Sequence, residues 1–185
     1  SMTLSALKKD ATFSTVTTDS RNMSAGDLYV ALKGERFNGD EFVEEALTKG
    51  AVAAVTHVSD GKGDAQRLVV DDTLVALATL ARLNRGRSSA TVIALTGSQG
   101  KTSVKEMIGS ILKAKAQTLI TAENLNNTIG VPLTLLRLEA RHEFAVIEMG
   151  ANGAGEIAVS VAATKPDIAL ITKASAAHIL SLIHI

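Results

Sequence analysis

The chain has 185 residues, of which 46% are hydrophobic, and it carries 19 basic and 19 acidic residues. This length allows one hydrophobic core or two small ones. The balanced charge gives no overall field that would attract nucleic acid or an anionic membrane surface. Because the sequence has no cysteine, disulfides, thiolate metal sites and a cysteine nucleophile are excluded.

Other features of the composition bear on partners and compartment. No apolar run in the sequence approaches the roughly 20 residues that span a membrane, and the N-terminus lacks the basic-then-apolar order of a signal peptide. Aromatic residues make up only 3% of the chain, which disfavours a surface that stacks on bases. We therefore expect a cytoplasmic protein with no nucleic-acid partner and no membrane insertion.

The first half of the chain alternates between strand and helix patterns. In chain order it predicts a strand at 26–32, an amphipathic helix at 39–50, strands at 51–57 and 67–70, and a helix at 71–85. Gly50 can end the first helix in the left-handed conformation, and Asp71 or Asp72 can cap the second. These elements indicate a small α/β unit.

The polar run Arg85–Ala90 is the best candidate for a domain boundary and gives predicted domains of 1–86 and 87–185. After it the sequence predicts a strand at 91–96, a helix at 101–115, a strand at 144–150, a helix at 155–164 and a strand at 166–172. Strands that alternate with helices in this way indicate a parallel α/β sheet. A nucleotide should then bind at the C-terminal ends of the strands.

The segment TGSQGKTS has the composition of a phosphate-binding loop between a strand and a helix. Its candidate nucleotide-binding residues are Thr96, Gly97, Ser98, Gln99, Gly100, Lys101, Thr102 and Ser103. The glycines permit a tight turn, Lys101 can reach the β- and γ-phosphates, and the Thr102 hydroxyl can bind magnesium. Leu95 stands where the full pattern has its first glycine, and the alternative interpretation is a glycine turn with an exposed lysine.

Two residues that follow predicted strands are candidate metal ligands. Glu148 ends the strand FAVIE, so its carboxylate should emerge at the same sheet edge as the loop; the alternative is a solvated glutamate. His178 follows the last predicted strand and is either a metal ligand or a surface histidine.

Three asparagines, Asn124, Asn126 and Asn127, lie within the segment ENLNNTIGVPLTLLRL. Their amides are suited to binding a ligand. The alternative is an asparagine-rich turn that caps the helix beginning at PLTLLRL.

At these residues the sequence resembles the Mur ligase family, which builds the peptide of bacterial cell-wall precursors. The resemblance rests on TGSQGKTSVKEM, NLNNTIGVPLTLLRL and VIEMGANGAGEI, and it extends over about Thr15–His178. It implies a small N-terminal α/β domain for the UDP end of a substrate, followed by an incomplete ATP-binding domain with a parallel sheet and a phosphate-binding loop. Because members of the family are more than twice as long, the chain is expected to be a fragment, and we expect a monomer at full length.

The resemblance also assigns roles to individual residues. It implies that Lys101 and Thr102 bind ATP and Mg²⁺, that Glu148 and His178 bind Mg²⁺, and that Lys101, Glu148 and His178 are catalytic. The residues implied at the substrate are Ser20, Arg21, Lys33 and Gly34 in the UDP-binding region, with Asn124, Asn126 and Asn127 near the γ-phosphate.

The implied reaction is an ATP-dependent amide synthesis with UDP-N-acetylmuramoyl-tripeptide and D-alanyl-D-alanine as substrates. A substrate carboxylate attacks the γ-phosphate to give an acyl phosphate, which an amine then displaces. Three alternatives stay open: a non-catalytic module that binds the UDP-sugar peptide, the sister ligase that adds the third residue, and an unrelated kinase or GTPase. The missing first glycine and the absence of an N-K-x-D motif count against the last.

Overall fold

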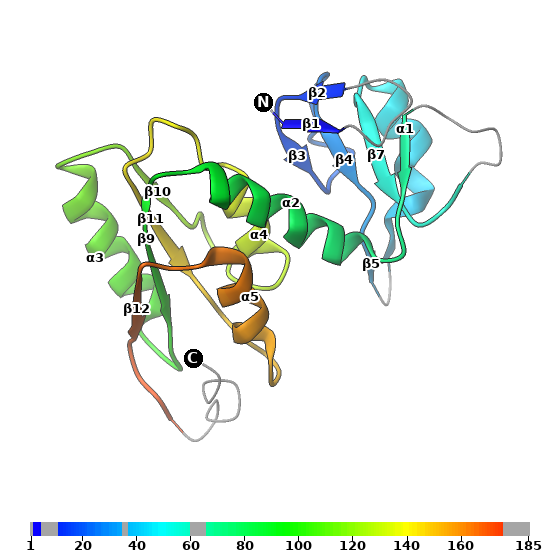
Figure 1. Ribbon diagram of the computed structural model, residues 1–185. Coiled ribbons are helices and arrows are strands. Elements are labelled where there is room, and N and C mark those ends of the chain that lie inside the picture. The colour runs from blue at the N-terminus through cyan, green and yellow to red at the C-terminus, as the bar shows by residue number, and fades with distance from the viewer. Residues whose placement is uncertain (1, 5–10, 35–36, 60–65, 176–185) are drawn as a thin grey trace. The chain divides into compact units, whose positions relative to one another are not determined.

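The computed structural model describes residues 2–4, 11–34, 37–59 and 66–175 (Figure 1). Its contacts divide the chain into two compact units, Ser1–Leu77 and Ala78–Ile185, called here the first and the second unit. The division falls inside helix α2 (Thr73–Arg87). The predicted boundary at 85–90 lies at the C-terminal end of that helix, and the predicted domain limits stay a prediction.

The first unit contains four parallel strands in the order β3-β4-β7-β8. These strands are β3 (Val16–Thr17), β4 (Leu28–Val30), β7 (Ala53–Thr56) and β8 (Arg67–Val69). Two short antiparallel pairs accompany the sheet: β1 (Met2–Leu4) with β2 (Ala11–Phe13), and β5 (Lys33–Gly34) with β6 (Phe37–Asn38). The three strands predicted for this half are confirmed, and the structure adds the shorter ones.

The helix predicted after β6 forms in two steps. A 3₁₀ turn, η1 (Gly39–Phe42), leads into α1 (Val43–Thr48). Gly50 follows with φ +99°, which confirms the left-handed termination. A Cβ on Gly39 would lie 2.6 Å from the carbonyl oxygen of Leu32, so glycine is required where the chain turns into the helix.

The core of the first unit lies between α1 and the sheet. The buried residues packed there include Tyr29, Ala31, Val43, Ala46, Ala51 and Ala54. Polar contacts fix the start of η1 to the end of β7, because Asp40 Oδ1 accepts hydrogen bonds from Thr56 Oγ1 at 2.5 Å and from the His57 backbone N–H at 3.1 Å. The Asp40 carboxylate thus ties η1 to the sheet.

Helix α2 is capped by one of the two aspartates proposed for that role. Asp72 Oδ1 accepts hydrogen bonds from the backbone N–H groups of Leu74, at 2.8 Å, and Val75, at 3.1 Å. These bonds satisfy two of the N–H groups that a helix start leaves without a partner. The cap is therefore Asp72 and not Asp71.

The second unit is a sheet of four parallel strands in the order β10-β11-β9-β12. The strands are β9 (Thr91–Thr96), β10 (Thr118–Ile120), β11 (Phe144–Glu148) and β12 (Ile168–Ile171). Glu148 is paired with Leu95, so the end of β11 and the end of β9 lie side by side. The predicted parallel sheet is confirmed, and β10 is an edge strand that the sequence did not predict.

Helices lie on both faces of this sheet, α3 (Lys101–Lys113) on one and α4 (Gly130–Leu135) with α5 (Glu156–Thr164) on the other (Figure 1). Alternation along each strand supplies apolar side chains to both faces. The core beneath α4 and α5 includes Val92, Ala94, Leu135, Ala145, Ile147 and Ile157. The helices predicted at 101–115 and 155–164 and the helix predicted from PLTLLRL are confirmed.

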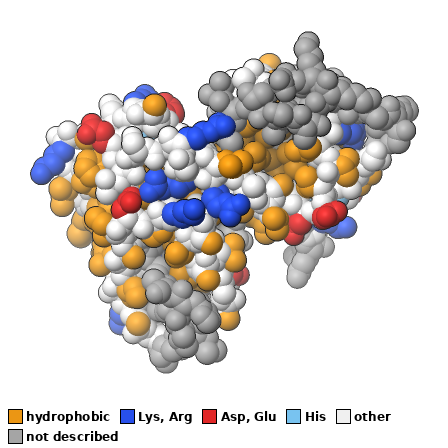
Figure 2. All heavy atoms as spheres, in the orientation of Figure 1, with side chains coloured by type: hydrophobic (Ala, Val, Ile, Leu, Met, Phe, Trp, Pro, Cys, Tyr) orange, Lys and Arg blue, Asp and Glu red, His pale blue; other side chains and the backbone are white. Residues whose placement is uncertain are grey.

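Among the described strands, β12 pairs only with β9, and all four residues of β12 are exposed. Apolar side chains also reach solvent elsewhere on the surface, as the orange spheres in Figure 2 show. Within the described part of the chain, no helix is both long enough and apolar enough to cross a membrane.

Candidate functional site

The loop between β9 and α3 depends on two glycines with positive φ. Gly97 has φ +144° and Gly100 has φ +79°. A Cβ on Gly97 would lie 2.2 Å from Thr172 Oγ1 and 2.9 Å from the backbone nitrogen of Lys173. The loop therefore needs glycine at 97 both for its backbone conformation and for the close approach of the segment after β12.

The N-terminus of α3 opens onto this loop. Its N-cap residue is Gly100, and no side chain of the described residues caps the helix there. The N–H groups of the first turn and the positive end of the helix dipole are thus left for an anion. Lys101 adds a cation to the same place, since its Nζ donates to the Gly97 carbonyl oxygen at 2.7 Å. This geometry is that of a phosphate-binding loop.

The segment that follows β12 forms hydrogen bonds to the loop. The Ser98 backbone N–H donates to the Lys173 carbonyl oxygen at 2.7 Å, and Thr172 Oγ1 donates to the Gln99 carbonyl oxygen at 2.6 Å. Lys173 Nζ also donates to Gln99 Oε1 at 3.1 Å. Because Ser98 and Gln99 are held in this way, the loop conformation is fixed by contacts from β12 as well as by its own glycines.

Glu148 lies at the C-terminal end of β11, beside the loop, as its position in the sequence predicted. Its side chain is buried, with the residue 1% exposed, so the interpretation as a solvated glutamate is wrong. Glu148 Oε1 lies 3.4 Å from Thr102 Oγ1 and accepts a hydrogen bond from Asn126 Nδ2 at 2.8 Å. The structure therefore brings together three of the predicted site residues.

A divalent cation fits this group of residues. Glu148 Oε2 is buried and makes no hydrogen bond within the described part of the chain, with the Lys105 ammonium 3.6 Å away, so it can take a further partner. The Thr102 hydroxyl lies beside the other carboxylate oxygen, Oε1. Carboxylate and hydroxyl oxygens are ligands that Mg²⁺ accepts, with phosphate and water oxygens completing its shell. Among the described residues, no three His, Cys, Asp or Glu side chains gather to hold a metal alone. The arrangement suits a cation that arrives with a nucleotide. His178, the other predicted ligand, lies outside the described residues.

The three asparagines divide between the two interpretations given to them. Asn126 contacts Glu148, as a site residue would. Asn127 Oδ1 accepts hydrogen bonds from the backbone N–H groups of Ile129, at 3.1 Å, and Gly130, at 2.7 Å, so Asn127 caps the start of α4. Asn124 is exposed. A role for these amides at a substrate stays a prediction.

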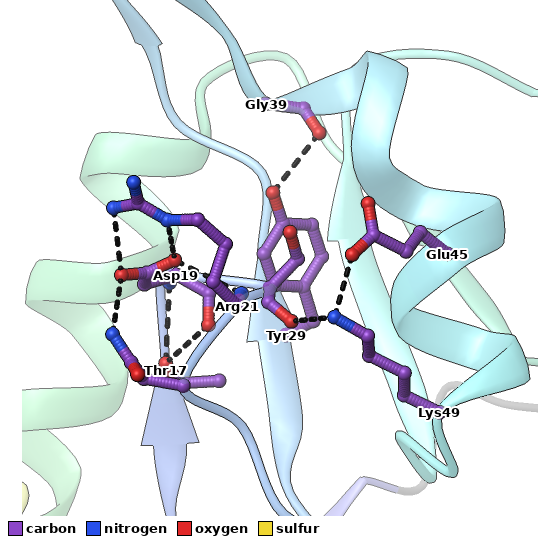
Figure 3. A network of polar contacts seen from close by, with 9 residues as sticks. Thr17, Asp19, Arg21, Tyr29, Gly39, Glu45 and Lys49 are labelled. Atoms are coloured by element: carbon purple, nitrogen blue, oxygen red, sulfur yellow. Dashed lines mark hydrogen bonds and ion pairs between the residues drawn. The ribbon is translucent and has the colours of Figure 1, made fainter.

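In the first unit, a turn after β3 holds the predicted residue Arg21 in a polar network (Figure 3). Arg21 Nε donates to Asp19 Oδ1 at 2.9 Å, and one of its terminal nitrogens donates to Asp19 Oδ2 at 3.0 Å. Side-chain and backbone hydrogen bonds from Arg21 hold the pKa of Asp19 well below its usual range. The guanidinium is therefore oriented at the surface by a carboxylate two residues away.

The neighbouring contacts fix the rest of this turn to α1. Lys49 Nζ donates to the Ser20 carbonyl oxygen at 2.9 Å and to Glu45 Oε1 at 2.6 Å (Figure 3). Tyr29 is buried in the same part of the unit, and its hydroxyl donates a hydrogen bond to the Gly39 carbonyl oxygen at 3.1 Å. Burial raises the pKa of the Tyr29 hydroxyl to about 12. The backbone of the buried residue Ser20 is thus held in place by the hydrogen bond from Lys49.

The other two residues predicted to bind substrate in this unit, Lys33 and Gly34, form β5 and are exposed. Their backbones pair with β6, with Lys33 opposite Asn38 and Gly34 opposite Phe37. They lie on a short antiparallel ribbon, and their role at a substrate stays a prediction.

The structure also reveals residues that the sequence did not single out. Lys105, in the second turn of α3, is 1% exposed and lies beside Glu148, while the Thr121 hydroxyl accepts from the Glu148 backbone N–H at 2.9 Å. One signal for Lys105 was present, because it follows Lys101 by one helical turn and precedes Gly109 by another. Asp19, which orients Arg21, directly precedes the predicted residues Ser20 and Arg21 in the sequence.

Two family models match the chain in succession. The model described as "Mur ligase family, catalytic domain" matches residues 12–85, and the model described as "Mur ligase middle domain" matches residues 95–181. The chain belongs to the Mur ligase family. The resemblance inferred from the motifs is thereby confirmed.

The curated relatives that match the chain include two enzymes of the same name. This Mur ligase chain is 50% identical over 171 residues to UDP-N-acetylmuramoyl-tripeptide--D-alanyl-D-alanine ligase of Escherichia coli, and the match covers 92% of the chain and 37% of the relative. The enzyme of the same name from Synechocystis is 42% identical over 180 residues, a match covering 96% of the chain and 40% of the relative. The chain thus spans well under half the length of these relatives.

Solved structures of Mur ligases also resemble the chain. MurF ligase from Thermotoga maritima in complex with ADP has a TM-score of 0.82 at 36% identity, covering 91% of this chain and 39% of that one. MurF from Acinetobacter baumannii has a TM-score of 0.81 at 44% identity, covering 89% and 36%. A ligase that adds 2,6-diaminopimelate reaches a TM-score of only 0.55 at 20% identity, which shows a shared fold alone. The predicted α/β fold class is confirmed.

Proposed function

We propose that this chain is the N-terminal and partial central part of a cytoplasmic, ATP-dependent ligase of peptidoglycan precursor synthesis. Its substrates would be UDP-N-acetylmuramoyl-tripeptide and D-alanyl-D-alanine, which appear in the name of a relative that is 50% identical to it. The observation that carries the proposal is the meeting of Thr102 and Glu148 at 3.4 Å, directly beside a glycine loop at a helix N-terminus. That geometry suits a nucleotide polyphosphate with its cation.

The reaction needs two anions to come together. A carboxylate of the UDP-linked substrate attacks the γ-phosphate of ATP, the γ-phosphoryl group passes to the carboxylate oxygen as an acyl phosphate, and ADP leaves. The amine of D-alanyl-D-alanine then displaces phosphate to form the amide. Mg²⁺ bound with the nucleotide would neutralise polyphosphate charge.

Each predicted residue has a part in that chemistry. The loop N–H groups of residues 97–103 would hold the polyphosphate, and Lys101 would neutralise its β- and γ-phosphates. Thr102 and Glu148 would hold the cation together with His178. Asn126 would keep the carboxylate of Glu148 oriented, since its amide donates to Oε1 at 2.8 Å.

The first unit would hold the UDP end of the substrate. Arg21 would present its guanidinium, which Asp19 orients, to a diphosphate, and Ser20, Lys33 and Gly34 would line the same region. This assignment is supported by the exposure of Arg21, whose side chain is 82% exposed and available to a ligand.

Calorimetric titration of the chain tests the proposal in two arms, one with UDP-N-acetylmuramoyl-tripeptide and one with ATP and Mg²⁺. We expect both ligands to bind. Lys101→Ala should abolish ATP binding and leave the UDP ligand unaffected, while Lys113→Ala, an exposed lysine at the far end of α3, serves as the matched control.

The outcomes separate the competing interpretations. Binding of the UDP ligand without ATP would favour a non-catalytic binding fragment. If a folded chain binds neither ligand, the proposed function is wrong for this chain. Equal ATP binding by the unsubstituted chain and Lys101→Ala would refute the assignment of the phosphate loop.

A further inference from the structure

Lys105 is a charged side chain in an unusual place. It lies in the second turn of α3, where the helix packs against the sheet, and only 1% of it is exposed. A buried ammonium is costly unless it is paired, so a lysine at this position needs partners. The structure supplies three of them.

One partner lies on α3 itself, and the other two come from segments that are distant in sequence. Lys105 Nζ lies 3.6 Å from Glu148 Oε2 at the end of β11 and 3.1 Å from Glu106 Oε1 on α3 itself. It also donates to the Glu123 carbonyl oxygen at 3.4 Å. Glu148 is as deeply buried as Lys105, whereas the Glu106 side chain is 60% exposed. The main charge partner in the interior is therefore Glu148.

Glu123 is the second informative partner because of its backbone. It has φ +46°, which is an unfavourable conformation for a residue with a Cβ. It lies directly before the asparagine segment, whose Asn126 reaches Glu148 Oε1. The Lys105 bond to the Glu123 carbonyl thus supports the turn that delivers Asn126.

Glu148 is consequently held from two sides. Asn126 and Thr102 contact Oε1, and Lys105 faces Oε2. Removal of the ammonium would leave Oε2 buried without a compensating charge, so the carboxylate would lose its fixed orientation.

We propose that Lys105 is a positioning residue of the nucleotide site, whose buried ammonium fixes both Glu148 and the turn at Glu123 beside the phosphate loop. The inference rests on the proposed function, since it concerns how Glu148 meets the cation that accompanies the nucleotide. Groups that orient a metal ligand typically contribute to metal affinity, so the loss of Lys105 should appear in the part of nucleotide affinity that depends on Mg²⁺.

The test is the effect of Mg²⁺ on ADP binding by this chain, measured calorimetrically with Mg²⁺ and with EDTA. In Lys105→Met, the Kd for ADP with Mg²⁺ should rise about 10- to 100-fold, the usual range for loss of a group that orients a metal ligand. The Kd in EDTA should stay the same. Lys105→Arg, which keeps the charge, should retain most of the Mg²⁺ effect, and Lys113→Met should retain all of it.

Several results would overturn the inference. A folded Lys105→Met that keeps the full Mg²⁺ effect would show that Lys105 does not position Glu148. Equal loss of ADP affinity with and without Mg²⁺ would indicate general damage to the loop. If Lys105→Met does not fold, Lys105→Gln, which retains a donor for the Glu123 carbonyl, is measured by the same criteria.

A double substitution sharpens the result. In a Glu148→Gln background, Lys105→Met should cause no further loss of the Mg²⁺ effect, because both changes act on one interaction. An unsubstituted chain that binds no ADP at all would refute the proposed function and this inference with it. Binding by the unsubstituted chain with an unchanged Lys105→Met would refute only the inference.

Discussion

The two units arrange their polar groups in opposite ways. In the second unit, Glu148 and Lys105 are each 1% exposed and meet in the interior at the end of a sheet. In the first unit, the Arg21 side chain is 82% exposed and is oriented by Asp19 two residues away. The buried pair of the second unit depends on the packing of distant segments, whereas the contact between Arg21 and Asp19 in the first unit depends on one local turn. Substitution of these polar residues should therefore lower the free energy of unfolding far more in the second unit than in the first.

The largest effect is expected from breaking the buried pair. Glu148→Ala leaves the Lys105 ammonium buried without its main partner, so the free energy of unfolding of the second unit should fall by about 3–5 kcal/mol. Asp19→Ala in the first unit should change stability far less. Urea denaturation with a probe in each unit measures both, and similar losses for the two variants would contradict the contrast.

Gly97→Ala should have the next largest effect. The new Cβ would collide with Thr172 Oγ1 and strain a backbone at φ +144°, which should cost about 1–3 kcal/mol. Gly100→Ala provides a comparison, because open space surrounds its Cβ position and only the backbone conformation opposes it. Equal destabilisation by both substitutions would show that the contact with the segment after β12 contributes nothing.

Asp72→Ala should cost about 1 kcal/mol, the usual loss for an N-cap. The change tests how the units are linked, because α2 begins in the first unit and ends in the second. Its effect should appear in the unfolding of both units when they are followed separately. Asp71→Ala is the matched control, and the cap assignment fails if it is equally destabilising.

The smallest effect is expected from pH. Burial raises the pKa of Asp40, but hydrogen bonds from Thr56 and His57 outweigh this effect and leave the pKa below its ordinary value. A carboxyl with a lowered pKa contributes stability above its unfolded-state pKa and loses it as the pH falls.

The stability of the first unit should therefore decline as the pH falls below about 4, and Asp40→Asn should weaken that dependence. Acid titration of unfolding, followed in the first unit, provides the measurement. A stability that rises on acidification in this range would contradict the assigned direction.

Local patterns were enough to predict most of the fold. The strand at 91–96 and the helix that begins at Lys101 agree with the structure to within a few residues, because each combines a clear periodicity with a glycine boundary. Strand β10 was missed since Thr118–Ile120 is only three residues long and is a strand through its pairing with β11. The two-residue strands of the first unit carry too little pattern for any period to be detected.

In the candidate site, too, the residues with local roles were predictable from the sequence, and those whose roles depend on long-range contacts were not. The phosphate loop was predictable because its residues are consecutive and its chemistry is local. The place of Glu148 at the sheet edge followed from where its strand ends. The helical spacing of Lys105 was visible in the sequence, but its role was not, since that role depends on Glu123 and Glu148, which reach Lys105 from other parts of the chain. Long-range packing decides whether a lysine on a helix faces solvent or a carboxylate.

The open N-terminus of α3 has a consequence for folding. With Gly100 as the cap residue, the first-turn N–H groups gain no acceptor from the side chains that the structure describes, so the helix begins without the stabilisation that Asp72 gives to α2. Any ligand that brings oxygen acceptors to these groups binds the folded unit and not the unfolded chain. If nucleotide binds here as proposed, it should therefore raise the melting temperature of the second unit as its concentration increases, so that the occupancy of the loop helps determine how much of this unit is folded.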